Sequence, residues 1–403
     1  MTIRHLYPAV EPSLNLDFAN SKRLDSRITF TRGSTATYTD KSGIIRTAAA
    51  NEARFDHDTD GNSLGLLIEE SRTNLFDQSE DLTTWTSNLY TTTNNQAISP
   101  DGTLNAASLV PDAGVTSQSS GRTVTQSAGN HVCSVFAKPN GLTVLKIRFS
   151  GSSYQAFFNL TGNGSVASQS NGTASISKRP DGWYRCVFVI NDSVGETAAW
   201  QLGHDDSSNV DGTNGFYIWG MQVEAGAFPT SYIPTSGSTV TRAADAASIT
   251  GTNFSSWYNS SAGTVFTKFK SQYPDGEPTT IFEGQAGSTI RIFAFTNYNR
   301  VQFQYGSTGV YSNDGASGYP TESDFSSAAL FYTDDGASSS FGGSYQGFPV
   351  KSGTGTGGVT ISSLIFAPFT GASGALQASS AHLSRLTYYP VRLPDATLQA
   401  LTL

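Results

Sequence analysis

The sequence predicts an all-β protein, with tandem antiparallel β-sandwiches after an extended N-terminal segment. Three observations predict this fold class: apolar and polar residues alternate along many short runs, Asn-Gly and Asp-Gly pairs separate these runs, and helical periodicity is nearly absent. The 403 residues leave room for two or three domains with buried cores. With 40 Gly and 15 Pro, the chain stays below the share of these residues that marks disorder.

Individual strands follow from the spacing of apolar residues. The runs 145–149 and 301–305 have an apolar side chain at every second position, as expected of strands with one buried face. The runs 216–223 and 290–295 are apolar on both faces, which is typical of strands buried between two layers. Turn pairs that supply the positive φ angles of tight hairpins occur at 101–102, 140–141, 171–172, 181–182, 211–212, 275–276, 314–315 and 335–336.

Changes in pattern divide the chain into four parts. Residues 1–75 have too little apolar pattern for a core of their own, so we expect them to pack against something else and to act as an anchoring or oligomerisation segment. Residues 76–235 and 248–403 each carry a long series of strands, and residues 236–247 are the predicted linker. One short helix is predicted within the last dozen residues, where Leu398 and Leu401 lie three apart.

The charge balance argues against a nucleic-acid ligand. Lys and Arg number 24 and Asp and Glu 32, which gives a net charge of −8. Only 14% of the residues are charged, against about 25% in an average soluble domain, so Ser, Thr, Asn, Gln and Gly must cover much of the surface. Such a composition is common in extracellular or virion proteins that meet sugars and other neutral polar ligands.

Two cysteines are too few for a disulfide scaffold or a Cys-rich zinc module. Cys133 and Cys186 both lie in strand-like runs, and we expect them to be small buried hydrophobic residues. The first residues contain no apolar export segment, and 18 consecutive apolar residues occur nowhere. We therefore expect no export signal and no insertion into a membrane.

Three phrases stand out near the N-terminus: LDFAN at 16–20, ITFTRGSTATY at 28–38 and LGLLIEESRTNL at 64–75. They resemble the N-terminal signature of a group of bacteriophage structural proteins of the tail-fibre or head-spike type. DGWYRC at 181–186 and GMQVEAGAFPTSYIPT at 220–235 resemble the jelly-roll, carbohydrate-binding-module-like segment that follows it. WYNSSAGT at 257–264 and LTYYPVRL at 386–393 resemble the opening and closing strands of a concanavalin A-like or laminin-G-like lectin domain.

This resemblance implies a non-enzymatic virion protein of a double-stranded DNA phage, usually a homotrimer. It would be made in the bacterial cytoplasm, be joined to other virion proteins through its N-terminal segment, and attach the particle to a bacterial surface glycan. No cofactor is expected. Two alternatives remain: a capsid, tail or baseplate decoration protein without a ligand, and a polysaccharide-degrading fibre.

Three segments imitate chemical motifs. Residues 61–65 match the G-x-S-x-G nucleophile elbow, but turn residues precede the serine and β-like residues follow it, which favours a hairpin over the required strand-to-helix turn. Residues 56–61 start like a calcium loop or a set of catalytic acids, but the twelfth position is Leu67 instead of Glu, which favours a solvated turn. The acidic segment 204–212 is similarly interpreted as a polar hairpin rather than a cation site. We predict no catalytic residue and no metal site.

Aromatic side chains are the candidates for stacking on sugar rings. Tyr311, Tyr319 and Tyr345 fall in segments rich in Gly, Ser and Asp, so we expect them to be exposed and they are our predicted glycan-binding residues. They could instead pack across a subunit interface or decorate loops. Three tryptophans lie within strand patterns and are predicted to belong to the core: Trp183, Trp200 and Trp219.

Overall fold

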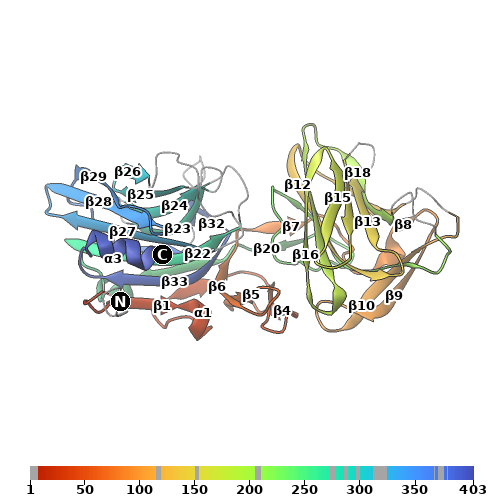
Figure 1. Ribbon diagram of the computed structural model, residues 1–403, viewed down its shortest axis with the longest axis horizontal. Helices are drawn as coiled ribbons and strands as arrows, with labels where there is room; N and C mark the ends of the chain where they lie inside the picture. The colour runs from red at the N-terminus through yellow and green to blue at the C-terminus, as the bar shows by residue number, and fades with distance from the viewer. Residues whose placement is uncertain are drawn as a thin grey trace.

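Most of the regular secondary structure of the described chain is β-strand, and the chain forms two bodies that lie end to end (Figure 1). The computed structural model describes residues 8–114, 119–149, 154–204, 210–272, 278–285, 289–295, 300–311, 325–366, 368–370, 376–378 and 380–403. Every ladder between its named strands is antiparallel, and the two bodies are β-sandwiches, so the predicted fold class is confirmed. In this part of the chain, no helix is long and apolar enough to cross a membrane.

The first body is a jelly-roll sandwich of two six-stranded sheets, with strand orders β16-β17-β12-β19-β10-β9 and β15-β14-β13-β18-β11-β8. The strands are β8 (Thr86–Ser87), β9 (Tyr90–Ile98), β10 (Leu104–Pro111), β11 (Ser119–Thr125), β12 (Gly129–Asn140), β13 (Val144–Phe149), β14 (Gln155–Asn159), β15 (Ser165–Ser170), β16 (Gly172–Lys178), β17 (Tyr184–Asp192), β18 (Thr197–His204) and β19 (Gly215–Ala225). Short 3₁₀ turns lie at Leu82–Thr84 and Pro180–Gly182.

The interior of the jelly roll is built as the alternation predicts. Leu145, Ile147 and Phe149 of β13 are fully buried, and Trp200 of β18 packs against Phe149 with ring centroids 5.1 Å apart. Trp183 and Trp219 are 2% and 1% exposed, so the predicted core positions of all three tryptophans are confirmed. The two cysteines are free and fully buried, as expected of small hydrophobic residues.

The second body is a sandwich of an eight-stranded and a seven-stranded sheet. The first sheet has the order β29-β28-β27-β22-β33-β6-β5, with β1 also on β33, and the second has the order β2-β21-β30-β23-β24-β25-β26. Their strands are β1 (Leu14–Asp17), β2 (Thr29–Thr31), β5 (Arg54–His57), β6 (Ser63–Ile68), β21 (Ala246–Thr250), β22 (Ala262–Ser271), β23 (Pro278–Gln285), β24 (Thr289–Phe295), β25 (Arg300–Tyr305), β26 (Thr308–Tyr311), β27 (Ser326–Asp334), β28 (Ser338–Tyr345), β29 (Lys351–Thr356), β30 (Ser363–Phe366) and β33 (Ala381–Tyr389).

Short elements complete the fold. The predicted C-terminal helix is confirmed as α3 (Asp395–Thr402), whose Leu398 is fully buried. Two other helices have one turn each, α1 (Phe18–Ser21) and α2 (Thr252–Ser255). Three small ladders join β3 (Ala36–Thr39) to β4 (Ile45–Ala48), β7 (Arg72–Asn74) to β20 (Val240–Arg242), and β31 (Pro368–Thr370) to β32 (Leu376–Ala378).

The N-terminal segment is part of the second sandwich. Strand β1 pairs with β33, with Leu14 opposite Tyr388, and β6 pairs with the same strand farther along. The side chains of Leu14, Leu16 and Phe18 are at most 2% exposed in the core of that sandwich. The jelly roll is therefore inserted between the two halves of the sandwich. This identifies the packing partner that the sequence left open, while the anchoring role of the segment stays a prediction.

A buried ion network lies at the junction of the two bodies. Arg54 donates to Glu69 at 2.7 Å and to Asp245 at 2.5 Å, Arg32 contacts Asp245 at 2.9 Å, and Arg242 lies 3.5 Å from Glu69. All five side chains are at most 1% exposed. Arg242 and Asp245 lie in the predicted linker. This connecting segment is therefore partly buried and takes part in the ion pairs. Removing one partner from such a network leaves the remaining charges buried without compensation.

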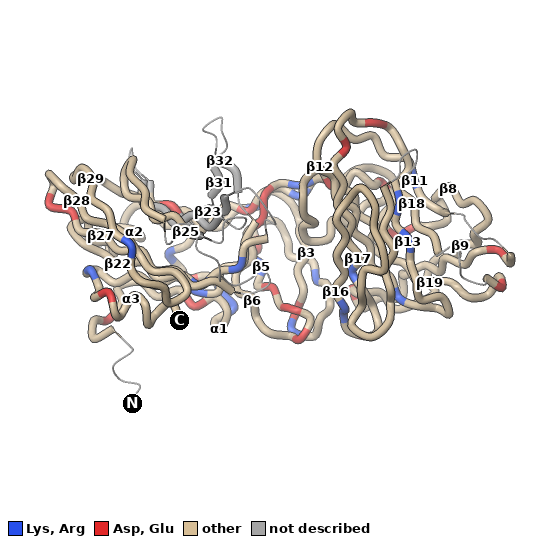
Figure 2. The backbone as a smooth tube through the Cα atoms, turned by 45° about the horizontal axis from the view of Figure 1, so that its top comes forward, with Lys and Arg blue, Asp and Glu red and all other residues tan. Residues whose placement is uncertain are grey.

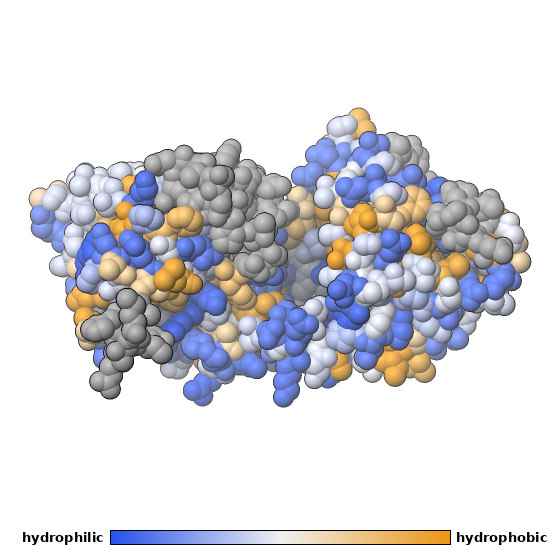
Figure 3. All heavy atoms as spheres, viewed as in Figure 1, coloured by the Kyte–Doolittle hydropathy of each residue, from blue (hydrophilic) through white to orange (hydrophobic). Residues whose placement is uncertain are grey.

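Charged residues are otherwise sparse along both bodies (Figure 2). The face seen in Figure 3 is mostly hydrophilic or neutral, and its hydrophobic residues form small separate areas. This agrees with the surface that the composition predicts, in which hydroxyl and amide side chains replace charged ones.

Candidate functional site

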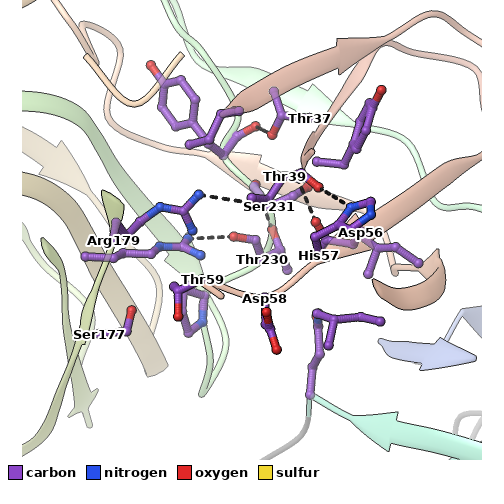
Figure 4. A pocket seen from close by; sticks show the side chains of 18 of the residues that line it. Thr37, Thr39, Asp56, His57, Asp58, Thr59, Ser177, Arg179, Thr230 and Ser231 are labelled. Atoms are coloured by element: carbon purple, nitrogen blue, oxygen red, sulfur yellow. Dashed lines mark hydrogen bonds between the residues drawn. The ribbon is translucent and has the colours of Figure 1, made fainter. Parts of the chain in front are cut away.

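A cavity of about 360 Å³ lies beside the ion network, where the two bodies meet. Five segments supply most of its walls: the hairpin of β3 and β4, the turn between β5 and β6, the end of β22, and two stretches of the jelly roll at 177–185 and 229–232. Figure 4 shows side chains from these segments pointing toward a common space. The lining residues with polar groups are Thr37, Tyr38, Thr39, Asp56, His57, Asp58, Thr59, Glu69, Ser177, Arg179, Arg185, Thr230, Ser231, Tyr232, Lys270 and Gln272.

Two guanidinium groups from the jelly roll enter this cavity. Arg179 stands just before the 3₁₀ turn at Pro180–Gly182, and its Nη2 donates to Thr39 Oγ1 at 3.2 Å and to Gly43 O at 3.1 Å. Arg185 on β17 donates from Nη2 to Ser134 Oγ at 3.3 Å and to Thr230 O at 2.7 Å. In the described part of the chain, neither guanidinium has a carboxylate within 4.0 Å.

Burial makes the charged form of both arginines less favourable. Burial and, to a smaller extent, the neighbouring charge of Arg185 together lower the pKa of Arg179 to about 10, against the attraction of Asp56. Burial also lowers the pKa of Arg185, against the attraction of more distant carboxylates. Phe136 lies between the two, with its ring centroid 5.7 Å from one guanidinium and 5.5 Å from the other. Arginine keeps its proton in proteins, and in the described part of the chain neither guanidinium has a direct counter-charge.

Each of these arginines also has an unused donor. The Nε atoms of Arg179 and Arg185 are buried and have no hydrogen-bond partner in the part of the chain that the structure describes. A buried donor without an acceptor costs roughly 1–3 kcal/mol, more for a charged group. A ligand oxygen placed near the guanidinium edges would offset part of this cost.

His57 brings an acceptor to the same cavity. The residue is 7% exposed, and its Nδ1 lies 3.1 Å from Thr39 O. Because a carbonyl oxygen can only accept, this contact assigns the proton to Nδ1. The other ring nitrogen, Nε2, is buried and has no partner, so in the neutral ring its lone pair can accept a hydrogen bond from a hydroxyl group.

The carboxylates of the cavity are already engaged. Asp56 accepts from the backbone N–H of Thr39 at 2.7 Å, and its other oxygen lies 2.9 Å from His382 Nε2. Glu69 accepts from Ser231 N and Oγ, both at 2.7 Å, in addition to its arginine partners. Burial alone would raise the pKa of Glu69, but the charges of Arg242 and Arg54 outweigh it and hold this pKa well below its usual range. The arrangement is thus suited to holding a polar ligand rather than to proton transfer.

Tyr311 and Tyr345, two of the three tyrosines predicted to bind a glycan, do not line this cavity. Tyr311 ends β26 and is 37% exposed, whereas Tyr319 lies outside the described residues. The expectation that Tyr345 is exposed on a loop is wrong: it lies on β28, is 7% exposed, and its hydroxyl is 2.9 Å from Ser326 Oγ. The two glycines that precede it, Gly342 and Gly343, also lie in this strand. Glycine is needed at position 342 because a Cβ there would lie 2.0 Å from Lys351 O on the adjacent strand.

The G-x-S-x-G match and the calcium-like segment fold as one hairpin between β5 and β6, as predicted. Ser63 of the G-x-S-x-G match opens strand β6, so residues 58–62 form a hairpin turn, in which Asp58 accepts from the N–H groups of Asp60 and Asn62. In the second acidic segment, residues 205–209 lie outside the described residues, and Asp211 accepts from the backbone of the turn that follows. Among the described residues, no group of three or more His, Cys, Asp and Glu side chains could hold a metal ion.

Sequence reasoning missed the residues that the structure brings together. The sequence indicates Asp56 and His57 only as part of a calcium-like segment, and it gives no site role to Arg185, which belongs to the DGWYRC phrase. One signal was available: Tyr184 and Cys186 alternate into the core, which places Arg185 on the opposite face of β17. The local sequence does not indicate that this face of β17 meets the β5–β6 turn of the other body.

Comparisons with known proteins leave the family open. No protein-family model and no curated protein matches the chain. Among solved structures, the CBM22-1–CBM22-2 tandem domain of Xyn10C from Paenibacillus barcinonensis is 8% identical, with a TM-score of 0.26 and coverage of 80% of this chain and 98% of that one. The LG4-5 domains of the mouse laminin α1 chain are 7% identical, with a TM-score of 0.22 and coverage of 82% and 96%.

A third similar structure is the LG1-3 region of the laminin α2 chain, at 9% identity and a TM-score of 0.21, with coverage of 66% of this chain and 62% of that one. TM-scores of this size are too low for any residue to be transferred from these proteins to this chain.

Proposed function

We propose that this chain is a non-enzymatic, glycan-binding component of a bacteriophage particle, displayed as a tail fibre or spike that attaches to a bacterial surface glycan. The observation that carries the glycan-binding part is the cavity between the two sandwiches. Among the described residues, it offers two guanidinium groups without carboxylate partners and a histidine acceptor without a donor. Sugars present hydroxyl groups that donate and accept, and they match such a mixed lining.

The dimensions of the cavity suit a sugar unit. Its volume of about 360 Å³ lies within the range of roughly 300–1,000 Å³ that is typical of small-molecule sites. Its rim carries the hydroxyl groups of Thr59 and Ser177, on exposed residues. A longer glycan could therefore continue past the rim while one unit occupies the cavity.

The engaged carboxylates support a binding role rather than hydrolysis. A glycosidase needs two carboxyl groups facing its substrate, one of them free to donate a proton. Here Asp56 is bonded to His382 and to a backbone N–H, and Glu69 is committed to the ion network. The virion role and the homotrimer rest on the resemblance of the N-terminal phrases to phage structural proteins, and three linked copies would raise a weak affinity through effective concentration.

Adsorption to bacteria tests the proposal. Fluorescently labelled full-length protein is incubated with host cells, and with the same cells after their surface polysaccharide has been removed chemically. We expect binding to the intact cells that is lost on the stripped cells, and no release of new reducing ends from the purified polysaccharide. Equal binding to both kinds of cell, or to neither, would favour a decoration protein. Release of reducing ends would show a polysaccharide-degrading fibre.

A further inference from the structure

We propose that the sugar unit held in the cavity is an acidic one, whose carboxylate lies between Arg179 and Arg185 while one of its hydroxyl groups donates to His57 Nε2. This inference rests on the proposed function and names the class of ligand for the same site.

The first argument is the balance of charge inside the cavity. Of the carboxylates that line it, Glu69 is matched by the arginines of the ion network, and Asp56 is bonded to His382. Asp58 accepts three hydrogen bonds from its own turn and is also influenced by the charge of Lys270. The charges of Arg179 and Arg185 are left without a direct counter-charge in the described part of the chain. A negative ligand would supply it.

The second argument is the donors that remain. A guanidinium group has five N–H donors, and in each of these two arginines the described hydrogen bonds all come from Nη2. Nη1 and Nε of both groups therefore remain for a ligand. Carboxylate oxygens form the strongest hydrogen bonds with such donors, because both partners are charged.

The third argument separates an acidic sugar from a bare anion. His57 Nε2 can accept a hydrogen bond, which a carboxylate alone cannot donate to it. It sits on β5 of the second sandwich, whereas the two arginines belong to the jelly roll. A ligand that satisfies all three must carry an anionic group at one end and a hydroxyl group at the other, and so must span the junction between the bodies.

Calorimetric titration of the full-length protein with four small probes tests the inference. The probes are D-glucuronate, its methyl ester, D-glucose and acetate, all at the same ionic strength. The ester and glucose keep the ring without the charge, and acetate keeps the charge without the ring. We expect glucuronate to bind at least about tenfold more tightly than each of the others, the effect of losing one charged hydrogen bond.

Variants then connect that difference to the cavity. Arg185→Gln and Arg179→Gln should each weaken glucuronate binding by about tenfold and bring it close to that of glucose. The matched control is Arg148→Gln on β13, whose guanidinium is hydrogen-bonded to Gln201 instead of lining the cavity, and it should bind like the wild type. Thermal unfolding checks that each variant is folded. If a cavity variant does not fold, titration of the wild-type protein with the four probes still tests whether the ligand is an acidic sugar.

Several outcomes overturn the inference. Equal binding of glucuronate and glucose would show a site for neutral sugars, so that the proposed function stands and the acidic class is wrong. Equal binding of acetate and glucuronate would show a simple anion site. No binding of glucuronate, while adsorption to polysaccharide-bearing cells persists, would place the glycan site elsewhere. Absence of both glucuronate binding and adsorption to these cells would contradict the proposed function as well.

Discussion

Arg54 and Arg185 lie on opposite sides of the same junction and are treated differently by the fold. Arg54 is fully buried and has two carboxylates within 2.7 Å, so its guanidinium is held by direct counter-charges. Arg185 also has a buried Nε, but its hydrogen bonds go to a serine hydroxyl and a backbone carbonyl. The first arrangement matches the charge and stabilises the junction, although Arg54 Nε too has no hydrogen-bond partner among the described residues. The second leaves interactions open, which is what a binding site requires.

The largest effect should come from opening the ion network. Asp245→Asn removes the carboxylate shared by Arg32 and Arg54, and it leaves two guanidinium groups buried with less compensation. We expect a loss of about 3–5 kcal/mol in the free energy of unfolding, measured by urea denaturation. A loss below about 1 kcal/mol would show that the network contributes little and would remove the contrast with the cavity.

Acid should weaken the same network in a graded way. The pKa of Glu69 is lowered in the folded protein, so the unfolded chain binds more protons and stability rises with pH in this range. The contribution of Glu69 is fully present above its unfolded pKa of about 4.3 and is lost as the pH falls below it. We expect the pH slope of the unfolding free energy below that value to be smaller in Glu69→Gln than in the wild type. Identical slopes would contradict this assignment.

Replacing the arginine of the cavity should have a much smaller effect on stability. Arg185→Met removes a partly buried charge that has no direct carboxylate partner among the described residues, together with two hydrogen bonds. We expect the free energy of unfolding to change by about 1 kcal/mol or less, because exchanging a poorly compensated buried charge for an apolar side chain is often neutral or stabilising. Binding to host cells should decrease at the same time. A loss as large as that of Asp245→Asn would mean that Arg185 belongs to the structural framework.

The smallest effect is expected at an exposed ion pair. Arg46 and Asp40 lie 2.8 Å apart with side chains that are 50% and 23% exposed, so solvent screens their attraction. Asp40→Asn should change the unfolding free energy by about 0–1 kcal/mol, which makes it the reference for the buried network in the same denaturation series. A change comparable to that of Asp245→Asn would show that burial is not the reason for the difference between the two pairs.

The strands and their burial followed from local pattern. Alternation placed Leu145, Ile147 and Phe149 in one core, and the positive φ expected after aspartate at the 101–102 turn is found at Gly102, where β9 and β10 join. Tyr345 shows where local pattern failed. The nearby glycines suggest a loop, but they lie within β28. The adjacent strand comes so close there that it leaves no room for a Cβ. Composition describes the residues of a segment but not how near its neighbours lie.

The sequence by itself determined the fold class, the alternation of buried and exposed positions and several of the turns, because these depend on residues a few positions apart. Only the tertiary structure decided that β1 and β6 complete a sheet with β33, and that Arg54 meets Asp245 across 191 positions of chain. The same holds for the cavity, where Arg179 and Arg185 approach the β5–β6 turn of the other body. Whether a buried charge is matched depends on what lies within a few ångströms in space, and a local pattern carries no information about that distance.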